Sequence, residues 1–248
     1  MNNEVLVEED YPFIRITLNR PNYGNAYNFQ TASSLIEIFK NIKKSENIYG
    51  VVIAGAGPHL CTGADLHWMS EAAALSHEEN LKDMAIIKGL YEEILTLSIP
   101  VIVVAKGKVR GGGVGLVAAA DIVLSASDTT FALTEARLGL IPGIISPILI
   151  AKIGRSRFLE MAISGREISV IEAHALGLVH QIIEPEKIEE ALKETLAGIR
   201  KSSRRSLIEI KKSLGSIYHE ETFDAFFRSS AQLRTTEEFR ERYKPRKK

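Results

Sequence analysis

The chain has 248 residues, of which 45% are hydrophobic and 25% are charged, as in an ordinary globular protein. Lysine plus arginine equals aspartate plus glutamate at 31 each, so no global basic field exists to attract nucleic acid or an anionic membrane. The single cysteine, Cys61, excludes an internal disulfide, and the acidic N-terminus lacks the pattern of a signal peptide. We therefore expect a soluble cytoplasmic protein.

The first half of the chain alternates between short apolar strands and helices. Alternating apolar residues, or short continuous apolar runs, predict strands over 4–8, 13–18, 50–54 and 100–105. Apolar residues at helical spacing predict helices over 29–43 and 69–97. Between them, residues 19–28 are rich in Asn, Pro and Gly and are typical of a loop.

The second half begins with strands and ends in helix. Strands are expected over 121–127, 130–133 and 179–183. Ser169 and Glu172 have the spacing of a capping box, and Gly177 stands where a C-terminal cap belongs, so 169–179 is expected to be helical. From Glu186 onward the pattern is purely helical. The chain is therefore expected to be α/β, with an all-helical last quarter.

Two corners of the chain run from a buried strand through small residues into a helix. Gly63 and Ala64 follow strand 50–54, and the three glycines 111–113 follow strand 100–105. Glycine costs about 1 kcal/mol relative to alanine in a helix, so three in a row require a reason. The first turn of a helix leaves N–H groups unpaired, and these can bind an anion or a developing oxyanion. Taken singly, each corner could instead be a tight turn that only permits packing of helix on sheet.

An ordered set of motifs carries a resemblance to a known family. The motifs are LNRP and NA (18–21 and 25–26), GADL (63–66), GGG (111–113), ADIVLSA (120–126), FALTEARLGLIPG (131–143) and GLVHQII (177–183). In these motifs the sequence resembles the enoyl-CoA hydratase/isomerase family, the crotonase superfamily, over nearly its whole length. The resemblance implies an α/β spiral of β-β-α units over 1–190. It also implies a helical region over 191–248 that assembles homotrimers, often paired into hexamers.

The resemblance also implies a substrate and a set of site residues. Family members bind acyl-CoA thioesters, need no metal or other cofactor, and hold the thioester oxygen with two backbone N–H groups. By motif position these N–H groups belong to Ala64 and Gly112. Residues expected to line the substrate and CoA site are Arg20, Ala26, Ala64, Asp65, Leu66, His67, Trp68, Gly111, Gly112, Pro142 and Gly143, with the last two opening the next helix.

Hydratases of this family typically use two glutamates, and only one of the two positions is acidic here. The first position holds Gly115, and the second holds Glu135, which is left to carry the acid–base chemistry. Asp65 is expected to be a hydrogen-bonding structural residue. A metal site is not expected from His59, His67 and Asp65, because three potential ligands on one flexible loop make a thin case. Cys61 is expected to be a buried filler.

Three functions remain open. The stretches GGGVGL and LTEARLGLIPGIISP are similar to bacterial hydratases of methylglutaconyl-CoA type, which act in leucine breakdown and share the glycine at position 115. An enoyl-CoA isomerase, as in fatty acid metabolism, needs only one base. A low-activity scaffold or RNA-binding protein is the third, although the neutral net charge argues against nucleic acid and the basic run 199–212 suits a solvated helix face. A dehalogenase would need an aspartate where Gly143 stands.

Overall fold

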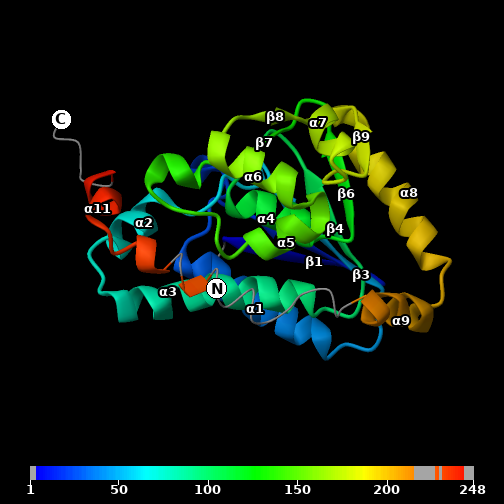
Figure 1. Ribbon diagram of the computed structural model, residues 1–248. Coiled ribbons are helices and arrows are strands. Elements are labelled where there is room, and N and C mark those ends of the chain that lie inside the picture. Colours follow the sequence, from blue (N-terminus) through cyan, green and yellow to red (C-terminus); the bar gives the residue numbers. More distant parts are fainter. Residues whose placement is uncertain (1–3, 215–226, 229–230, 243–248) are drawn as a thin grey trace.

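A largely parallel sheet forms the centre of the molecule (Figure 1). The computed structural model describes residues 4–214, 227–228 and 231–242. Within these residues the main sheet contains, in spatial order, β1 (Val5–Asp10), β2 (Phe13–Leu18), β3 (Gly50–Gly55), β4 (Val101–Ala105), β6 (Ile122–Ala126) and β9 (Gln181–Ile183). β1 is antiparallel to β2, and each later pair of neighbours is parallel. The expected α/β class is confirmed.

A second, small sheet gives the fold its repeating unit. It pairs β5 (Lys108–Arg110), β7 (Thr130–Ala132) and β8 (Ile168–Ser169). β4 leads into β5 and then α4 (Gly112–Ala119), while β6 leads into β7 and then a 3₁₀ helix, Glu135–Leu138. β3 leads in the same way to Cys61, which forms a single parallel bridge with Val109, and then to α2 (Leu66–Ala72). Successive units therefore supply one strand to the main sheet, one strand or bridge to the small sheet, and one helix.

Both faces of the main sheet are covered, which explains the continuous apolar runs of its strands. Val51 and Ile53 of β3 face one core, shared with α1 (Phe29–Lys43), α3 (His77–Leu95) and α4. Val52 and Ala54 face a second core, closed by α8 (Ile188–Arg200). Other α-helices of the described residues are α5 (Ser146–Ile153), α6 (Arg155–Ser164), α7 (Val170–Ala175), α9 (Arg204–Leu214) and α11 (Glu237–Arg242). None of the described helices is long and apolar enough to cross a membrane.

The boundaries of several elements differ from those expected. The helix expected over 69–97 is wrong, because α2 ends at Ala72 and α3 begins at His77. Ser76 separates the two helices: its hydroxyl accepts from the N–H of Glu79, whose carboxylate accepts from the N–H of Ser76. The capping box at Ser169 and Glu172 is confirmed. The short strand β5 was not expected.

The helix expected to open at Pro142 and Gly143 is also misplaced. α5 begins at Ser146, whose hydroxyl donates to the carbonyl of Pro142 at 2.7 Å. The all-helical pattern expected after Glu186 is confirmed for the described residues, and its parts at 215–226, 229–230 and 243–248 lie outside them.

Asn25 joins the loop 19–28 to the first of the two corners. Asn25 is 1% exposed, and its φ of 56° lies in the left-handed region that asparagine tolerates. Its side-chain amide donates to the carbonyls of Ala56 and His59 at 2.8 and 2.7 Å, and its side-chain oxygen accepts from the N–H of Arg20 at 2.8 Å. One buried side chain thus satisfies three backbone groups from two loops.

Replacing Asn25 by alanine is expected to destabilise the protein by roughly 2–4 kcal/mol, because buried carbonyls lose their donor and alanine does not favour positive φ. Urea unfolding of N25A measures the loss. N41A removes an exposed amide from α1 and is the control, expected to change stability by less than about 0.5 kcal/mol. Equal stabilities of N25A and N41A would contradict this role.

Candidate active site

The register of the small sheet brings three corners of the chain together. Cys61 bridges Val109, and Val109 is in turn paired with Phe131. Parallel neighbours in register leave a sheet at the same edge. Ala64 lies three residues after Cys61, and Gly112 lies three residues after Val109. Glu135 lies four residues after Phe131. The three residues singled out in the sequence therefore meet at one edge, although 71 positions separate Ala64 from Glu135.

A mostly apolar cavity of about 210 Å³ opens at this edge. Ala64, Gly112 and Glu135 all line it. Apolar side chains from α2, α3 and the segment before α5 complete the wall, among them Leu66, Trp68, Met69, Met84, Ile87, Leu138, Leu140, Ile141, Ile144 and Ile145. Of the described residues that line the cavity, Glu135 alone is acidic and Arg234 alone is basic. Such a cavity suits an acyl chain with a polar group at one point.

The backbone around Ala64 is held by Tyr27. The N–H of Tyr27 donates to the carbonyl of Gly63 at 2.8 Å, and the N–H of Asp65 donates to the carbonyl of Tyr27 at 2.7 Å. These two hydrogen bonds form a parallel bridge that uses the backbone groups of Gly63 and Asp65, on either side of Ala64. The N–H of Ala64 has no partner among the described residues. An unpaired N–H at a cavity wall is available to an oxygen of a ligand.

Each glycine of the triplet is required by a different neighbour. Gly111 has φ of 48°, and a Cβ there would stand 3.1 Å from Oε1 of Glu135. A Cβ on Gly112 would stand 2.6 Å from the ring of Tyr27, and one on Gly113 would stand 2.2 Å from the carbonyl oxygen of Cys61. The glycines therefore bring the start of α4 against the first corner. The N–H of Gly112, in the first turn of α4, also has no partner among the described residues.

Glu135 carries a carboxyl group withdrawn from solvent. The residue as a whole is half-buried, yet Oε2 is inaccessible and has no hydrogen-bond partner among the described residues. Burial disfavours the charged form and raises the pKa of this carboxyl to about 7, although N–H groups of Thr134 and Glu135 itself offset part of the effect. A carboxyl with this pKa can both accept and donate a proton near neutral pH.

The predicted CoA-site residues divide into two groups. Those that line the cavity are Ala64, Leu66, Trp68, Gly111, Gly112, Pro142 and Gly143. Four do not line it: Arg20, Ala26, Asp65 and His67. Arg20 forms a 2.7 Å ion pair with Asp65 and donates to the carbonyl of Ala26 at 2.6 Å, while Asp65 caps α2 through the N–H of His67. Arg20 and Asp65 thus brace the first corner, and His67 is exposed beside Glu71.

The histidine and cysteine of the first corner have other surroundings. Nδ1 of His59 accepts from the N–H of Lys108 at 3.1 Å. Cys61 is fully buried, and burial raises the pKa of its thiol to about 12, so it is a neutral thiol at physiological pH. The expectation of a buried filler agrees with this position.

The sequence analysis missed several lining residues, among them Tyr27, Tyr91 and Arg234. Tyr27 follows the NA motif directly, but nothing local shows that its ring reaches α4. Tyr91 lies on the buried face of α3, and helical spacing alone cannot say which helix that face meets. Arg234, which is 5% exposed, comes from the C-terminal segment and pairs with Asp83 at 2.7 Å. Arg234 is far along the chain from the other lining residues, so no local pattern indicates that it reaches the cavity.

Comparison with known proteins agrees with this geometry. The profile of the family described as "Enoyl-CoA hydratase/isomerase" matches residues 9–242. The chain belongs to this family. Its expected identity as an enzyme of the enoyl-CoA hydratase/isomerase family is therefore confirmed, and so is its crotonase fold.

Individual members of the enoyl-CoA hydratase/isomerase family match most of the chain. A Thermus thermophilus protein whose name assigns it to the enoyl-CoA hydratases is 28% identical over 229 residues, 91% of this chain and 90% of its own. The 1,2-epoxyphenylacetyl-CoA isomerase of Escherichia coli is 26% identical, over 81% of this chain and 78% of its own. A solved enoyl-CoA hydratase/isomerase from Marinobacter aquaeolei is 29% identical with a TM-score of 0.83, covering 90% of this chain and 88% of its own.

The raised pKa of Glu135 predicts a pH-dependent stability. The folded value of about 7 lies above the ordinary 4.5, so the native state loses stability as pH rises from 4.5 through 7. We expect E135Q to gain stability relative to wild type between pH 5 and pH 8, by up to roughly 3 kcal/mol.

Urea unfolding of both proteins at pH 5 and pH 8 measures this difference. E190Q, which removes an exposed carboxyl from α8, controls for the loss of one negative charge. A stability difference between E135Q and wild type that is the same at both pH values would contradict the buried, protonatable carboxyl.

Proposed function

We propose that the protein adds water across the double bond of an enoyl-CoA, with Glu135 as the one acid–base residue. The observation that supports this most strongly is the meeting of two unpaired N–H groups and one buried carboxyl in a single cavity. In the proposed complex the N–H groups of Ala64 and Gly112 donate to the thioester oxygen. Each such donor typically contributes about 3–4 kcal/mol to transition-state stabilisation.

One carboxyl can carry both proton transfers of the reaction in sequence. The Glu135 carboxylate takes a proton from water as the water oxygen bonds to the β-carbon, and the electrons of the double bond move onto the thioester oxygen as an enolate. The protonated carboxyl then gives that proton to the α-carbon as the carbonyl re-forms. A pKa of about 7 suits both steps, because neither protonation state is strongly favoured at neutral pH.

A branched acyl group with a second carboxylate, of the methylglutaconyl-CoA type, is the proposed substrate. The motifs around 111–116 and 133–147 support it by resemblance. Arg234 supports it physically, because its guanidinium is the one cationic group among the described residues that line a mostly apolar cavity. One guanidinium nitrogen donates to Asp83 and another to the Met69 sulfur, and the charge of Asp83 stabilises the buried cation. With this substrate the reaction would belong to leucine breakdown.

The same geometry supports an enoyl-CoA isomerase as a second candidate. Moving a proton from one carbon to another needs one base and an enolate, and Glu135 is the one carboxyl among the described lining residues. The name of the Escherichia coli relative is that of an isomerase. Both candidates form the same enolate, so they differ in whether water enters the product. We propose a homotrimer, or two trimers paired into a hexamer, as the assembly for either reaction.

Incubation with a panel of enoyl-CoAs in heavy-oxygen water separates the candidates. We expect label in the product and faster turnover of methylglutaconyl-CoA than of crotonyl-CoA, which lacks the second carboxylate. A double-bond shift without label would establish the isomerase instead. No turnover of any thioester would contradict both reactions and leave the scaffold, for which retained RNA binding is the further test.

E135Q tests the role of the carboxyl itself. We expect kcat to fall by about 10²–10⁴, the usual contribution of a general acid–base residue, with the Kd for the CoA thioester nearly unchanged. Stopped-flow turnover and calorimetric binding measure the two quantities. Unchanged kcat would remove Glu135 from the mechanism, and lost binding would give it a structural role.

A further inference from the structure

We propose that Tyr91 is a positioning residue: it fixes Gly112 at the cavity wall and occupies the space in which a second carboxylate would otherwise stand. The catalytic part of this inference rests on the proposed function, and the packing part does not. No feature of the sequence around Tyr91 marks it. Its role follows from a hydrogen bond, a steric contact and an electrostatic effect.

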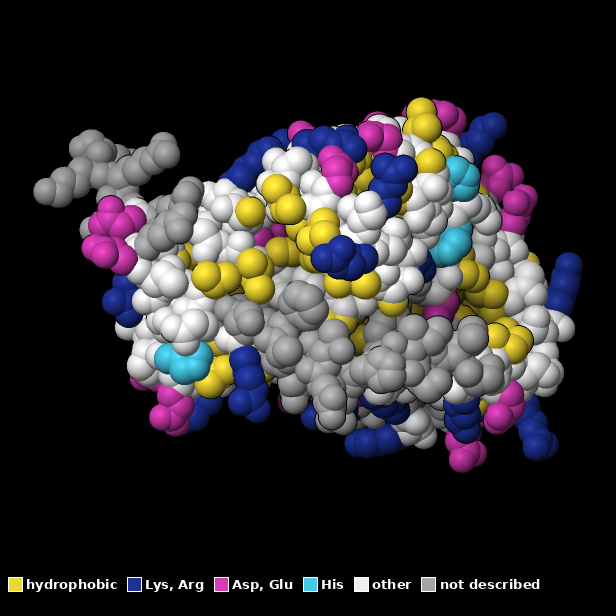
Figure 2. Space-filling model, in the orientation of Figure 1, with side chains coloured by type: hydrophobic (Ala, Val, Ile, Leu, Met, Phe, Trp, Pro, Cys, Tyr) yellow, Lys and Arg dark blue, Asp and Glu magenta, His cyan; other side chains and the backbone are white. Residues whose placement is uncertain are grey.

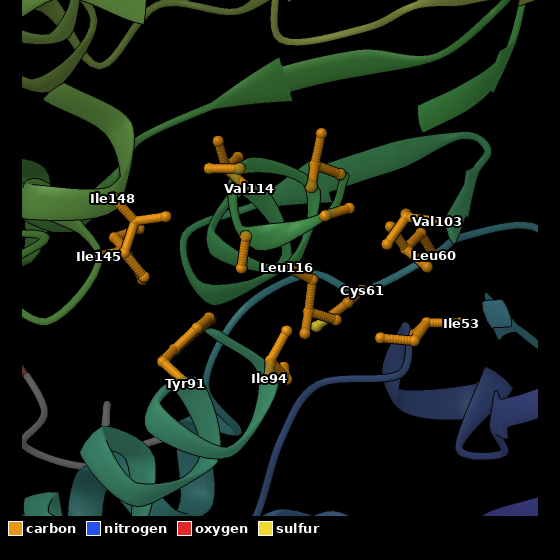
Figure 3. Close-up of a cluster of buried hydrophobic side chains, with 14 of the residues drawn as sticks. Ile53, Leu60, Cys61, Tyr91, Ile94, Val103, Val114, Leu116, Ile145 and Ile148 are labelled. Atoms are coloured by element: carbon orange, nitrogen blue, oxygen red, sulfur yellow. The ribbon is translucent and has the colours of Figure 1, made fainter. Parts of the chain in front are cut away.

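The first contact is a hydrogen bond to the backbone of Gly112. The Tyr91 hydroxyl donates to the Gly112 carbonyl at 2.6 Å, and the Tyr27 hydroxyl donates to the same oxygen at 3.2 Å. Figure 3 shows Tyr91 pointing from α3 toward α4. Glycine has no Cβ to restrict its rotation, so two donors on its carbonyl limit the orientations that its peptide groups adopt. The N–H of the same residue is the proposed ligand of the thioester oxygen.

The second contact explains why position 115 holds glycine. A Cβ added to Gly115 would stand 2.5 Å from the Tyr91 hydroxyl oxygen and 2.8 Å from Cζ of its ring. Cγ2 of Ile145 would be 2.4 Å from the same Cβ. Figure 3 shows the side chains of Ile145 and Tyr91 both beside α4. A glutamate at 115 would have to pass through atoms that are already present. Tyr91 and Ile145 therefore exclude the two-glutamate arrangement by volume.

The third observation is an electrostatic effect on the Tyr91 hydroxyl. Tyr91 lines the same cavity as Glu135, and both burial and the negative charge of Glu135 raise the pKa of its hydroxyl above the ordinary range. The Tyr91 hydroxyl is therefore a neutral hydrogen-bond donor near neutral pH. A second carboxylate would instead repel the charge of Glu135. With Tyr91 in this place, a single titrating acid remains among the described lining residues.

Conservative variants separate positioning from packing. Y91F keeps the ring and removes the hydroxyl, and Y27F removes the longer of the two bonds to Gly112. We expect Y91F to lower kcat roughly 2- to 12-fold with KM unchanged, and Y27F to lower it less, because one hydrogen bond that matters in the transition state is lost. The assay is turnover of whichever thioester the wild type accepts. Unchanged kcat in Y91F, or a loss confined to KM, would overturn the positioning role.

A stability comparison tests the packing part without any assay of activity. Gly115 and Gly198 both lie inside helices, and a Cβ on Gly198 would meet nothing within 4 Å. G115A is expected to lower the melting temperature, because its Cβ collides with Tyr91 and Ile145, whereas G198A is expected to keep or raise it. A G115A protein as stable as G198A would overturn the inference. A wild type that turns over no thioester would refute the proposed function and leave this comparison valid.

Discussion

The site depends on the parallel register between β5 and β7 of the small sheet and on the bridge that joins Cys61 to β5. Cys61 bridges Val109 of β5, and Val109 pairs with Phe131 of β7, so these three neighbours determine which residues leave the sheet together. A slip of one residue at Val109 would rotate Gly112 away from the cavity and bring Gly111 or Gly113 into its place. In the observed register, a Cβ on Gly113 would collide with the Cys61 carbonyl and one on Gly111 would crowd Glu135. The glycines therefore permit the close approach of two N–H groups and one carboxyl.

The electrostatic properties of the N–H groups and of Glu135 follow from their position in the cavity. An apolar cavity makes an N–H group a stronger ligand for a developing oxyanion than the same group in water, and it also makes a carboxylate costly. The pKa of about 7 for Glu135 is the result of that cost. On the outside of the molecule, Figure 2 shows both dark blue and magenta side chains on the face in view.

Local patterns predicted most of the fold. Strand β2 and helix α1 have the expected bounds, and the capping box at Ser169 has both of its hydrogen bonds. The single helix expected over 69–97 was wrong because its apolar spacing continues past the break at Ser76. Resemblance placed Ala64, Gly112 and Glu135, which do line one cavity, although their roles stay predictions. Arg20 and Asp65 pair with each other and do not line the cavity. Tyr91, Tyr27 and Arg234 could not be found, since contacts between distant segments leave no local trace in a sequence.

The most direct test is a structure of the protein with a bound, unreactive analogue of an enoyl-CoA thioester. The account predicts the thioester oxygen 2.7–3.1 Å, the usual range for such donors, from both the Ala64 and the Gly112 nitrogens. It also predicts a Glu135 oxygen within hydrogen-bond reach of the α-carbon or of a water beside the β-carbon. A thioester oxygen bound elsewhere, or a Glu135 carboxyl turned out of the cavity, would contradict it.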